Sequence, residues 1–214
     1  MKTKRLSLLA LVLFLHAAAT AQSARPATPE ERQFVMENIE KAAREMSSLT
    51  CDFKQTKDLS ILDEKMISTG CVYYRRDSRL RWEYLSSYAY TFILNDKKIL
   101  TRTGETRNVI DVKSSKLFQE IVKIMMSSVN GSGLTDEKRF AATYLRGDAT
   151  WTVILLPLQR EIKKMFSTIE LTFNATDYTV DRVKMSEPNG DVTLVELSGK
   201  HFNITLDDEI FDMD

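Results

Sequence analysis

Apolar and polar positions alternate along much of the chain between Leu49 and Lys98. The clearest stretch has Leu80, Trp82 and Tyr84 at every second position, with charged residues at positions 79, 81 and 83. Successive side chains of a strand point to opposite faces, so the aromatic residues share one face and the charged ones a solvated face. The pattern predicts a half-buried antiparallel sheet with an unusually large aromatic face.

The same pattern recurs further along, with turn residues between the runs. It predicts strands at about 50–58, 66–75, 80–85, 89–95, 98–103, 106–111, 140–146, 150–157, 167–174, 179–186, 191–198 and 202–206. Residues 158–165 are compatible with either a helical turn or a polar loop.

Two segments have the helical period instead. Thr28, Pro29 and Glu31 form a helix start, with a capping residue, a proline at the first position and a glutamate three residues after the cap. That helix is predicted to run to about residue 47. A second apolar stripe spans 114–128 and ends at the glycine-rich residues 130–133.

Together these elements predict a mostly β domain with some α structure. We expect a strongly curved antiparallel sheet that forms an incomplete barrel, covered by two or three helices. So few helices cannot cover the whole apolar face, so a cavity is expected there. For any single residue, an ordinary core position remains the alternative. Candidate cavity residues on the strands are Phe53, Leu80, Trp82, Tyr84, Phe92 and Trp151.

The first 21 residues have the pattern of a signal peptide. Lys2, Lys4 and Arg5 precede an apolar run at 6–15, and Ala19-Thr20-Ala21 provides a cleavage site before Gln22. The run is shorter than the roughly 20 residues of a membrane-spanning helix. An uncleaved N-terminal anchor is the alternative. We expect a signal peptide at 1–21 and a single soluble exported domain at 22–214, with an apolar cavity that takes a lipid-like ligand.

The net charge and the residue types present exclude several classes of function. The whole chain has 30 basic and 30 acidic residues, and removal of residues 1–21 leaves a net charge of about −3, which gives no general attraction for nucleic acid. His16 and His201 are the only histidines, and no nucleophile elbow or phosphate-binding glycine loop is present. We therefore expect neither an enzyme nor a metal site or cofactor.

Cys51 and Cys71 are the only cysteines of the chain. An even pair in an exported protein is compatible with a disulfide, and the two lie on strands that are predicted to form a hairpin. Two free cysteines that behave as small apolar residues are the alternative.

Several segments resemble a known family. They are the strand 51–57, the glycine-led strand 70–74 (Gly-Cys-Val-Tyr-Tyr) and the strand 80–84 (Leu-Arg-Trp-Glu-Tyr), with weaker similarity at 181–185, 187–191 and 202–211. This order resembles the periplasmic outer-membrane lipoprotein carrier family, LolA. The similarity covers most of the chain after residue 21 and is specific in the first hundred residues.

The resemblance implies a function and two roles for residues. It places Met125 on a lid helix over the cavity, and it assigns Arg76 as a latch that binds backbone carbonyls of that lid. Asp77 stands where the family usually has proline. The implied function is a monomeric periplasmic carrier of acylated lipoproteins, with an inner-membrane releasing transporter and an outer-membrane acceptor as partners. A binding or sensing module for another lipid-like ligand on the same fold is the alternative.

Overall fold

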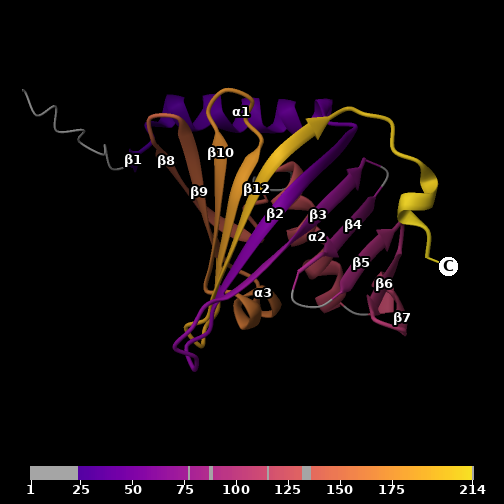
Figure 1. Ribbon diagram of the computed structural model, residues 1–214. Helices are drawn as coiled ribbons and strands as arrows, with labels where there is room; N and C mark the ends of the chain where they lie inside the picture. Colours follow the sequence, from indigo (N-terminus) through magenta and orange to yellow (C-terminus); the bar gives the residue numbers. More distant parts are fainter. Residues whose placement is uncertain (1–23, 77, 87–88, 115, 132–135, 214) are drawn as a thin grey trace, which may run out of the picture.

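The computed structural model describes residues 24–76, 78–86, 89–114, 116–131 and 136–213. Within these residues one antiparallel sheet contains twelve strands in the order β1-β8-β9-β10-β11-β12-β2-β3-β4-β5-β6-β7 (Figure 1). The strands are β1 (Arg25–Pro26), β2 (Ser48–Asp58), β3 (Met66–Arg75), β4 (Arg79–Tyr84), β5 (Tyr90–Asn95), β6 (Lys98–Thr103), β7 (Thr106–Asp111), β8 (Phe140–Arg146), β9 (Thr150–Pro157), β10 (Thr168–Asn174), β11 (Val180–Ser186) and β12 (Val192–Phe202).

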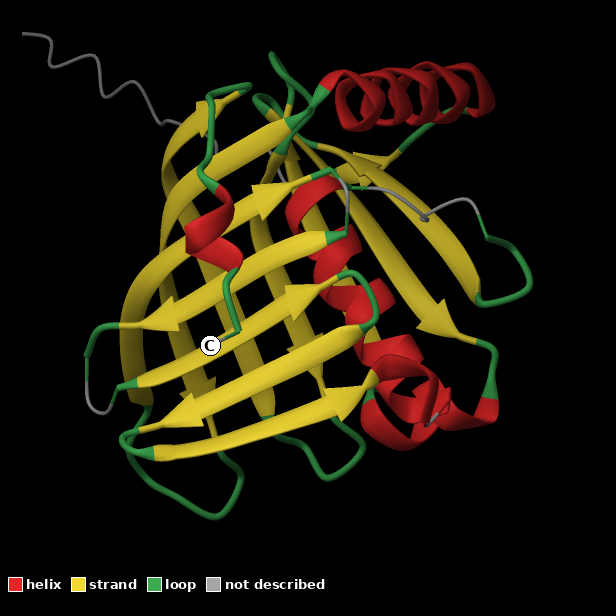
Figure 2. Ribbon diagram, turned by 90° about the vertical axis from the view of Figure 1, so that its right-hand side faces the viewer, coloured by secondary structure: helices red, strands yellow, loops and turns green. Residues whose placement is uncertain are grey.

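Three α-helices and two short 3₁₀ helices accompany the sheet in the described part of the chain. They are α1 (Pro29–Glu45), η1 (Val112–Ser114), α2 (Lys116–Asn130), α3 (Arg160–Met165) and η2 (Asp208–Phe211). Figure 2 shows the sheet curving around α2, which lies on the concave side. The outer strands β1 and β7 do not pair with each other, so the barrel is open. The expected curved sheet with two or three helices is confirmed.

Most element boundaries agree with the predictions to within two residues. Three segments differ. The two-residue strand β1, which pairs with β8, was not among the predicted strands. The predicted strands 191–198 and 202–206 are replaced by one long strand, β12, whose register against β2 shifts between Ser198 and His201. Gly199 lies in that irregularity with φ +60°, a conformation that glycine adopts without strain. The ambiguous segment 158–165 contains the short helix α3.

Helix α1 lies across one end of the sheet (Figure 1) and begins as predicted. The Glu31 N–H donates to Thr28 Oγ1 over 3.2 Å, and the Thr28 N–H donates to the Glu31 carboxylate over 3.0 Å. The buried residues Val35 and Ile39 face the core. Gly131 ends α2 with φ +73°, and a Cβ there would lie 3.2 Å from the Ile39 side chain, so this close approach of α2 to α1 requires glycine.

The C-terminal segment covers the outer face of the sheet. Phe211 is fully buried there against Ile93 and Leu100, on the side opposite α2 (Figure 2). Arg75 Nη1 donates to the Leu206 carbonyl over 2.9 Å. The segment thus provides an apolar cover for positions that would otherwise be on the solvated side.

Two arginines of β4 also bind this segment, contrary to the expectation of a solvated face. Arg79 Nη1 donates to the Asp208 carboxylate over 2.6 Å, and Arg81 Nη1 donates to the Ile210 carbonyl over 3.3 Å. Their side chains are less than one quarter exposed. The charged face of β4 therefore anchors the end of the chain.

The possible disulfide between Cys51 and Cys71 is not formed, and both thiols are free. Cys51 pairs with Val72 in the β2–β3 ladder, and Cys71 pairs with Asp52. The two side chains therefore leave the sheet on opposite faces, Cys51 toward the core and Cys71 outward. The predicted hairpin is correct, but its register separates the two sulfur atoms.

The described residues contain no helix long and apolar enough to cross a membrane, and no cluster of three or more histidine, cysteine or acidic residues that could hold a metal ion. The predicted signal peptide at 1–21 lies outside the described residues.

Candidate functional site

A cavity of about 360 Å³ lies between the concave face of the sheet and α2. Its wall is formed mainly by aromatic, aliphatic and methionine side chains of β4–β7, β11, β12 and α2. The described lining residues are Gln55, Trp82, Tyr84, Tyr90, Phe92, Ile99, Thr101, Ile110, Ile124, Met125, Val183, Met185 and Val195. None of them carries a charge, so the wall suits an apolar ligand.

Four of the seven predicted cavity residues line this space: Trp82, Tyr84, Phe92 and Met125. Trp82 and Phe92 are directly opposite each other in the β4–β5 ladder, and Tyr84 follows Trp82 on the same face. Met125 reaches the wall from α2, where the resemblance placed it. The alternation in the sequence thus identified the correct face of β4 and β5.

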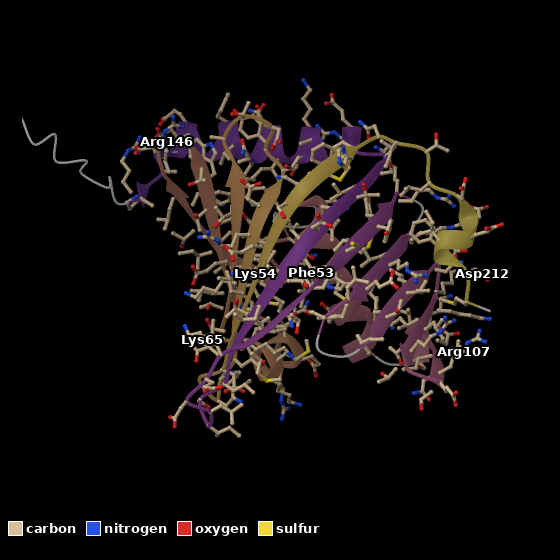
Figure 3. All side chains as sticks on the ribbon, in the orientation of Figure 1. Phe53, Lys54, Lys65, Arg107, Arg146 and Asp212 are labelled. Atoms are coloured by element: carbon tan, nitrogen blue, oxygen red, sulfur yellow. The ribbon has the colours of Figure 1, made fainter. Side chains whose placement is uncertain are left out.

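Phe53, Leu80 and Trp151 are core residues and do not line the cavity. The Phe53 ring packs behind the wall, with its centroid 5.0 Å from both the Trp82 and Tyr84 rings. Trp151 lies on β9, in the other wing of the sheet. Figure 3 shows the alternation on β2, where Phe53 is buried and the neighbouring Lys54 is exposed. All three side chains are buried on the predicted inward face, but they are packed in the core and do not border the open space.

Gly70 explains why Phe53 lies behind the wall. A Cβ on Gly70 would lie 2.7 Å from the Phe53 ring and 1.9 Å from the Glu83 carbonyl oxygen. The missing side chain therefore lets the ring fold over β3 and support Trp82 and Tyr84 from behind. This is a physical reason for the glycine that begins the resembling strand segment.

The wall has a small polar part that the sequence analysis missed. The Tyr84 hydroxyl donates to Gln55 Oε1 over 3.0 Å. Trp82 Nε1 is buried and has no hydrogen-bond partner. Gln55 continues the inward positions 49, 51 and 53 of β2, so the strand period was the signal that could have identified it.

Helix α2 is held at both ends by polar contacts. Near its start, Arg139 donates to the Glu120 carboxylate over 3.1 Å from Nε and 2.5 Å from Nη2, and both side chains are nearly buried. Lys123 also binds this carboxylate, over 3.0 Å. At the other end, Asn130 Nδ2 donates to the Tyr74 hydroxyl over 3.2 Å. These contacts connect α2 to the turn before β8 on one side and to β3 on the other.

The charge state of Glu120 follows from this environment. Desolvation by burial acts to raise its pKa, but hydrogen bonds from Lys123 and Arg139 and their positive charges outweigh it, so the pKa is lowered. Glu120 is therefore ionised at neutral pH, and the contact between Glu120 and Arg139 is a buried ion pair.

Arg76 binds a different helix from the one that the resemblance implied. Its guanidinium donates to the Met46 carbonyl over 3.2 Å and to the Arg44 carbonyl, both at the C-terminal end of α1. Carbonyl capture at a helix end occurs as expected from the fixed donors of arginine. Arg76 shares a cleft with Lys123 and Met126 of α2, but none of its hydrogen bonds to described residues reaches that helix.

The sequence profile named "Outer membrane lipoprotein carrier protein LolA" matches residues 44–214. The chain belongs to the LolA family. The match begins at the end of α1 and includes the whole cavity wall, α2 and the C-terminal segment. Members of this family are carrier or binding proteins. A search of curated protein sequences gives no significant match.

Solved structures that resemble this chain do so at low sequence identity. A LolA superfamily protein from Nitrosomonas europaea is 10% identical, with a TM-score of 0.43, over 83% of this chain and 97% of that one. The Pseudomonas aeruginosa MucA/MucB complex gives 11% identity and a TM-score of 0.50, over 83% of this chain and 59% of that one. The lipoprotein LppX of Mycobacterium tuberculosis gives 12% identity and 0.46, over 84% and 100%.

Proposed function

We propose that this LolA family protein is a periplasmic carrier that shields the acyl chains of lipoproteins and moves them from the inner to the outer membrane. The uncharged cavity between the concave sheet and α2 is the observation that carries the proposal. The family match over residues 44–214 supports it. Residues 1–21, with the pattern of a signal peptide, would direct the protein to the periplasm.

The mechanism follows from apolar burial. Each Å² of acyl chain removed from water is worth about 25 cal/mol, so a whole chain would be held too tightly to leave unless its burial also had a cost. Displacement of α2 provides that cost, because the ligand must compete with the contacts at Glu120 and Tyr74. The carrier then has a moderate affinity, and cargo passes to an acceptor that binds it more tightly.

The proposal requires two partners, which are those that the family resemblance implies. A transporter in the inner membrane would release the lipoprotein to this protein, and an acceptor at the outer membrane would receive it. The carrier itself is expected to act as a monomer, since the described residues that line this cavity all come from one chain.

The deciding experiment uses membranes that hold labelled lipoprotein. Incubation with the protein lacking residues 1–21 is expected to yield a soluble one-to-one complex that size-exclusion chromatography separates from the membranes. A matched pair of variants tests the site. Thr101→Trp fills the cavity from β6 and should abolish the complex, whereas Arg102→Trp places the same ring on the outer face and should not. Equal extraction by both variants contradicts the proposed cavity.

The alternative function is a binding or sensing module for another lipid-like ligand. The cavity volume favours it, because about 360 Å³ is near the lower end of the roughly 300–1,000 Å³ of small-ligand sites and suits one chain rather than several. Mass spectrometry of ligand that co-purifies with the protein distinguishes the two functions. A small lipid that lipoprotein cannot displace favours the module.

A further inference from the structure

The uncharged wall has a consequence for ligand class. An ionised carboxylate inside this cavity would lose its hydration without meeting a cation, since no described lining residue is basic. Such a transfer is strongly unfavourable. Lys123 of α2 and Arg139, just before β8, are engaged with Glu120, and none of the three is among the lining residues. The cavity should therefore favour neutral ligands over free fatty acids in their ionised form.

The polar part of the wall includes a hydrogen-bond donor that has no acceptor. Trp82 is 7% exposed and its Nε1, the only polar atom of the side chain, has no partner. Arg75 and Arg79 also have a buried Nε without a partner, but their other guanidinium nitrogens bind the C-terminal segment. Trp82 thus differs from both in having its entire hydrogen-bonding capacity unused. A buried donor of this kind gains more from an acceptor than an exposed one does.

Gln55 adds a second polar group to the same wall. The Tyr84 hydroxyl, two residues after Trp82 on the inner face of β4, fixes the Gln55 amide through its oxygen. The amide nitrogen of Gln55, which also lines the cavity, is a second neutral donor type in this wall. Both donors are neutral, so they can bond to a carbonyl oxygen but bring no positive charge to offset the desolvation of an anion.

We propose that the cavity selects neutral acyl esters, with the hydrocarbon chain against the apolar wall and the ester carbonyl oxygen accepting a hydrogen bond from Trp82 Nε1. This inference rests on the proposed function and specifies its ligand chemistry. Nε1 is shielded from solvent. Binding as proposed therefore requires that the ligand displace side chains of the wall to bring its carbonyl to this atom. Met125 gives that wall a flexible side chain on α2.

Three probes of equal chain length separate the contributions: methyl palmitate, palmitate and the matching alkane. Binding to the parent protein at pH 8 should be at least about tenfold tighter for the ester than for ionised palmitate. Trp82→Phe should weaken ester binding by roughly three- to tenfold relative to alkane binding. Phe92→Leu, opposite Trp82 in the ladder, removes a ring without a donor and should change both equally.

A direct measurement keeps the test independent of these variants. The chain has two tryptophans, so the indole N–H resonances of the ¹⁵N-labelled parent can be assigned with one variant. Methyl palmitate should shift the Trp82 resonance downfield and leave Trp151, which lies outside the cavity, in place. The alkane should produce no downfield shift.

The outcomes distinguish the two proposals. An unchanged Trp82 resonance, or equal effects of Trp82→Phe on ester and alkane, overturns the role of Nε1 while the lipid cavity stands. Equal affinity for ester and ionised palmitate overturns the selection for neutral ligands. If none of the three probes binds the parent, the proposed function fails together with this inference.

Discussion

Cys51 and Cys71 lie on paired strands, but their thiols differ in burial and should differ in reactivity. Burial raises the pKa of the Cys51 thiol to about 12, so it has almost no thiolate at pH 8. We expect a thiol reagent to label one cysteine, Cys71, slowly in the native protein and both in denaturant. Mass spectrometry of the labelled peptides identifies the site. Denatured, unreduced protein without free thiols would show that the disulfide forms after all.

Gly70 allows the Phe53 ring to cross β3. Gly70→Ala should lower the free energy of unfolding by about 1–3 kcal/mol, because the new methyl group meets both the Glu83 carbonyl and the Phe53 ring. Denaturant unfolding measures the change. Thr69→Ala, at the exposed neighbouring position, is the control and should have little effect. A fully stable Gly70→Ala would mean that β3 and β4 shift without cost.

At the scale of elements, α2 depends on a buried ion pair. Arg139→Met leaves the Glu120 carboxylate with Lys123 as its only cation, at a cost of up to about 3 kcal/mol. Amide exchange in α2 should increase by a factor of ten or more. The double variant Glu120→Gln/Arg139→Met removes the uncompensated charge and should recover part of the protection.

Arg76→Leu is the matched comparison for that helix. It removes hydrogen bonds to Arg44 and Met46, so faster exchange is expected at the end of α1 and not in α2. If Arg76→Leu loosens α2 as much as Arg139→Met does, the latch implied by the family resemblance operates in solution despite the contacts of this structure.

The Asp208 carboxylate holds the C-terminal segment against the sheet, and acid removes its charge by protonation. Hydrogen bonding and the positive charge of Arg75 lower the pKa of Asp208 below its ordinary value of 3.8, with a further contribution from Arg79. A lowered pKa means that the contact is fully formed above about pH 4 and is lost as the pH falls through the lower, folded-state value. NMR of the Phe211 ring protons should report release of the segment in that range.

Asp208→Asn is the control for this titration. The variant has no carboxylate to protonate, so the acid transition of Phe211 should disappear and the segment should be looser already at neutral pH. If Phe211 keeps the same acid transition in Asp208→Asn, another group controls the contact.

The strands were predictable because a two-residue period survives wherever one face is buried. The pairing partners were not. Strand β12 lies between β11 and β2, so the end of the chain completes the sheet beside its first long strand. The period of β4 likewise could not reveal that Leu206 and Phe211 would cover its charged face. The alternation of apolar and polar positions within one strand carries no information about contacts with residues more than 100 positions away.

The cavity likewise could be predicted only in part from the sequence. Alternation identified the inward face, including Trp82 and Phe92, but Leu80 and Trp151 are equally inward and lie in filled parts of the core. Whether an inward position meets open space depends on where α2 lies over the sheet. Gln55 was missed for a related reason, because a polar residue at an inward position was not taken as part of an apolar wall.

At the scale of the whole molecule, stability should fall from the centre of the sheet to its edges. The two longest strands, β2 and β12, lie at the centre and pair with each other over most of their length, whereas β7 is an exposed edge. Amide exchange should therefore be slowest in β2 and β12 and fastest in β7 and α2. Mass spectrometry of exchanged peptides tests this order, and α2 exchanging as slowly as β2 would contradict a displaceable helix.

The open seam between β1 and β7 has a consequence for capacity. In a closed barrel, strand number and stagger set a fixed internal radius. Here the two rims have no hydrogen bonds to each other, so they can separate without breaking the sheet. Interior volume then becomes an adjustable quantity, limited by how far α2 yields. For the proposed carrier, a bulkier ligand would cost more free energy to accommodate and would therefore be released more readily.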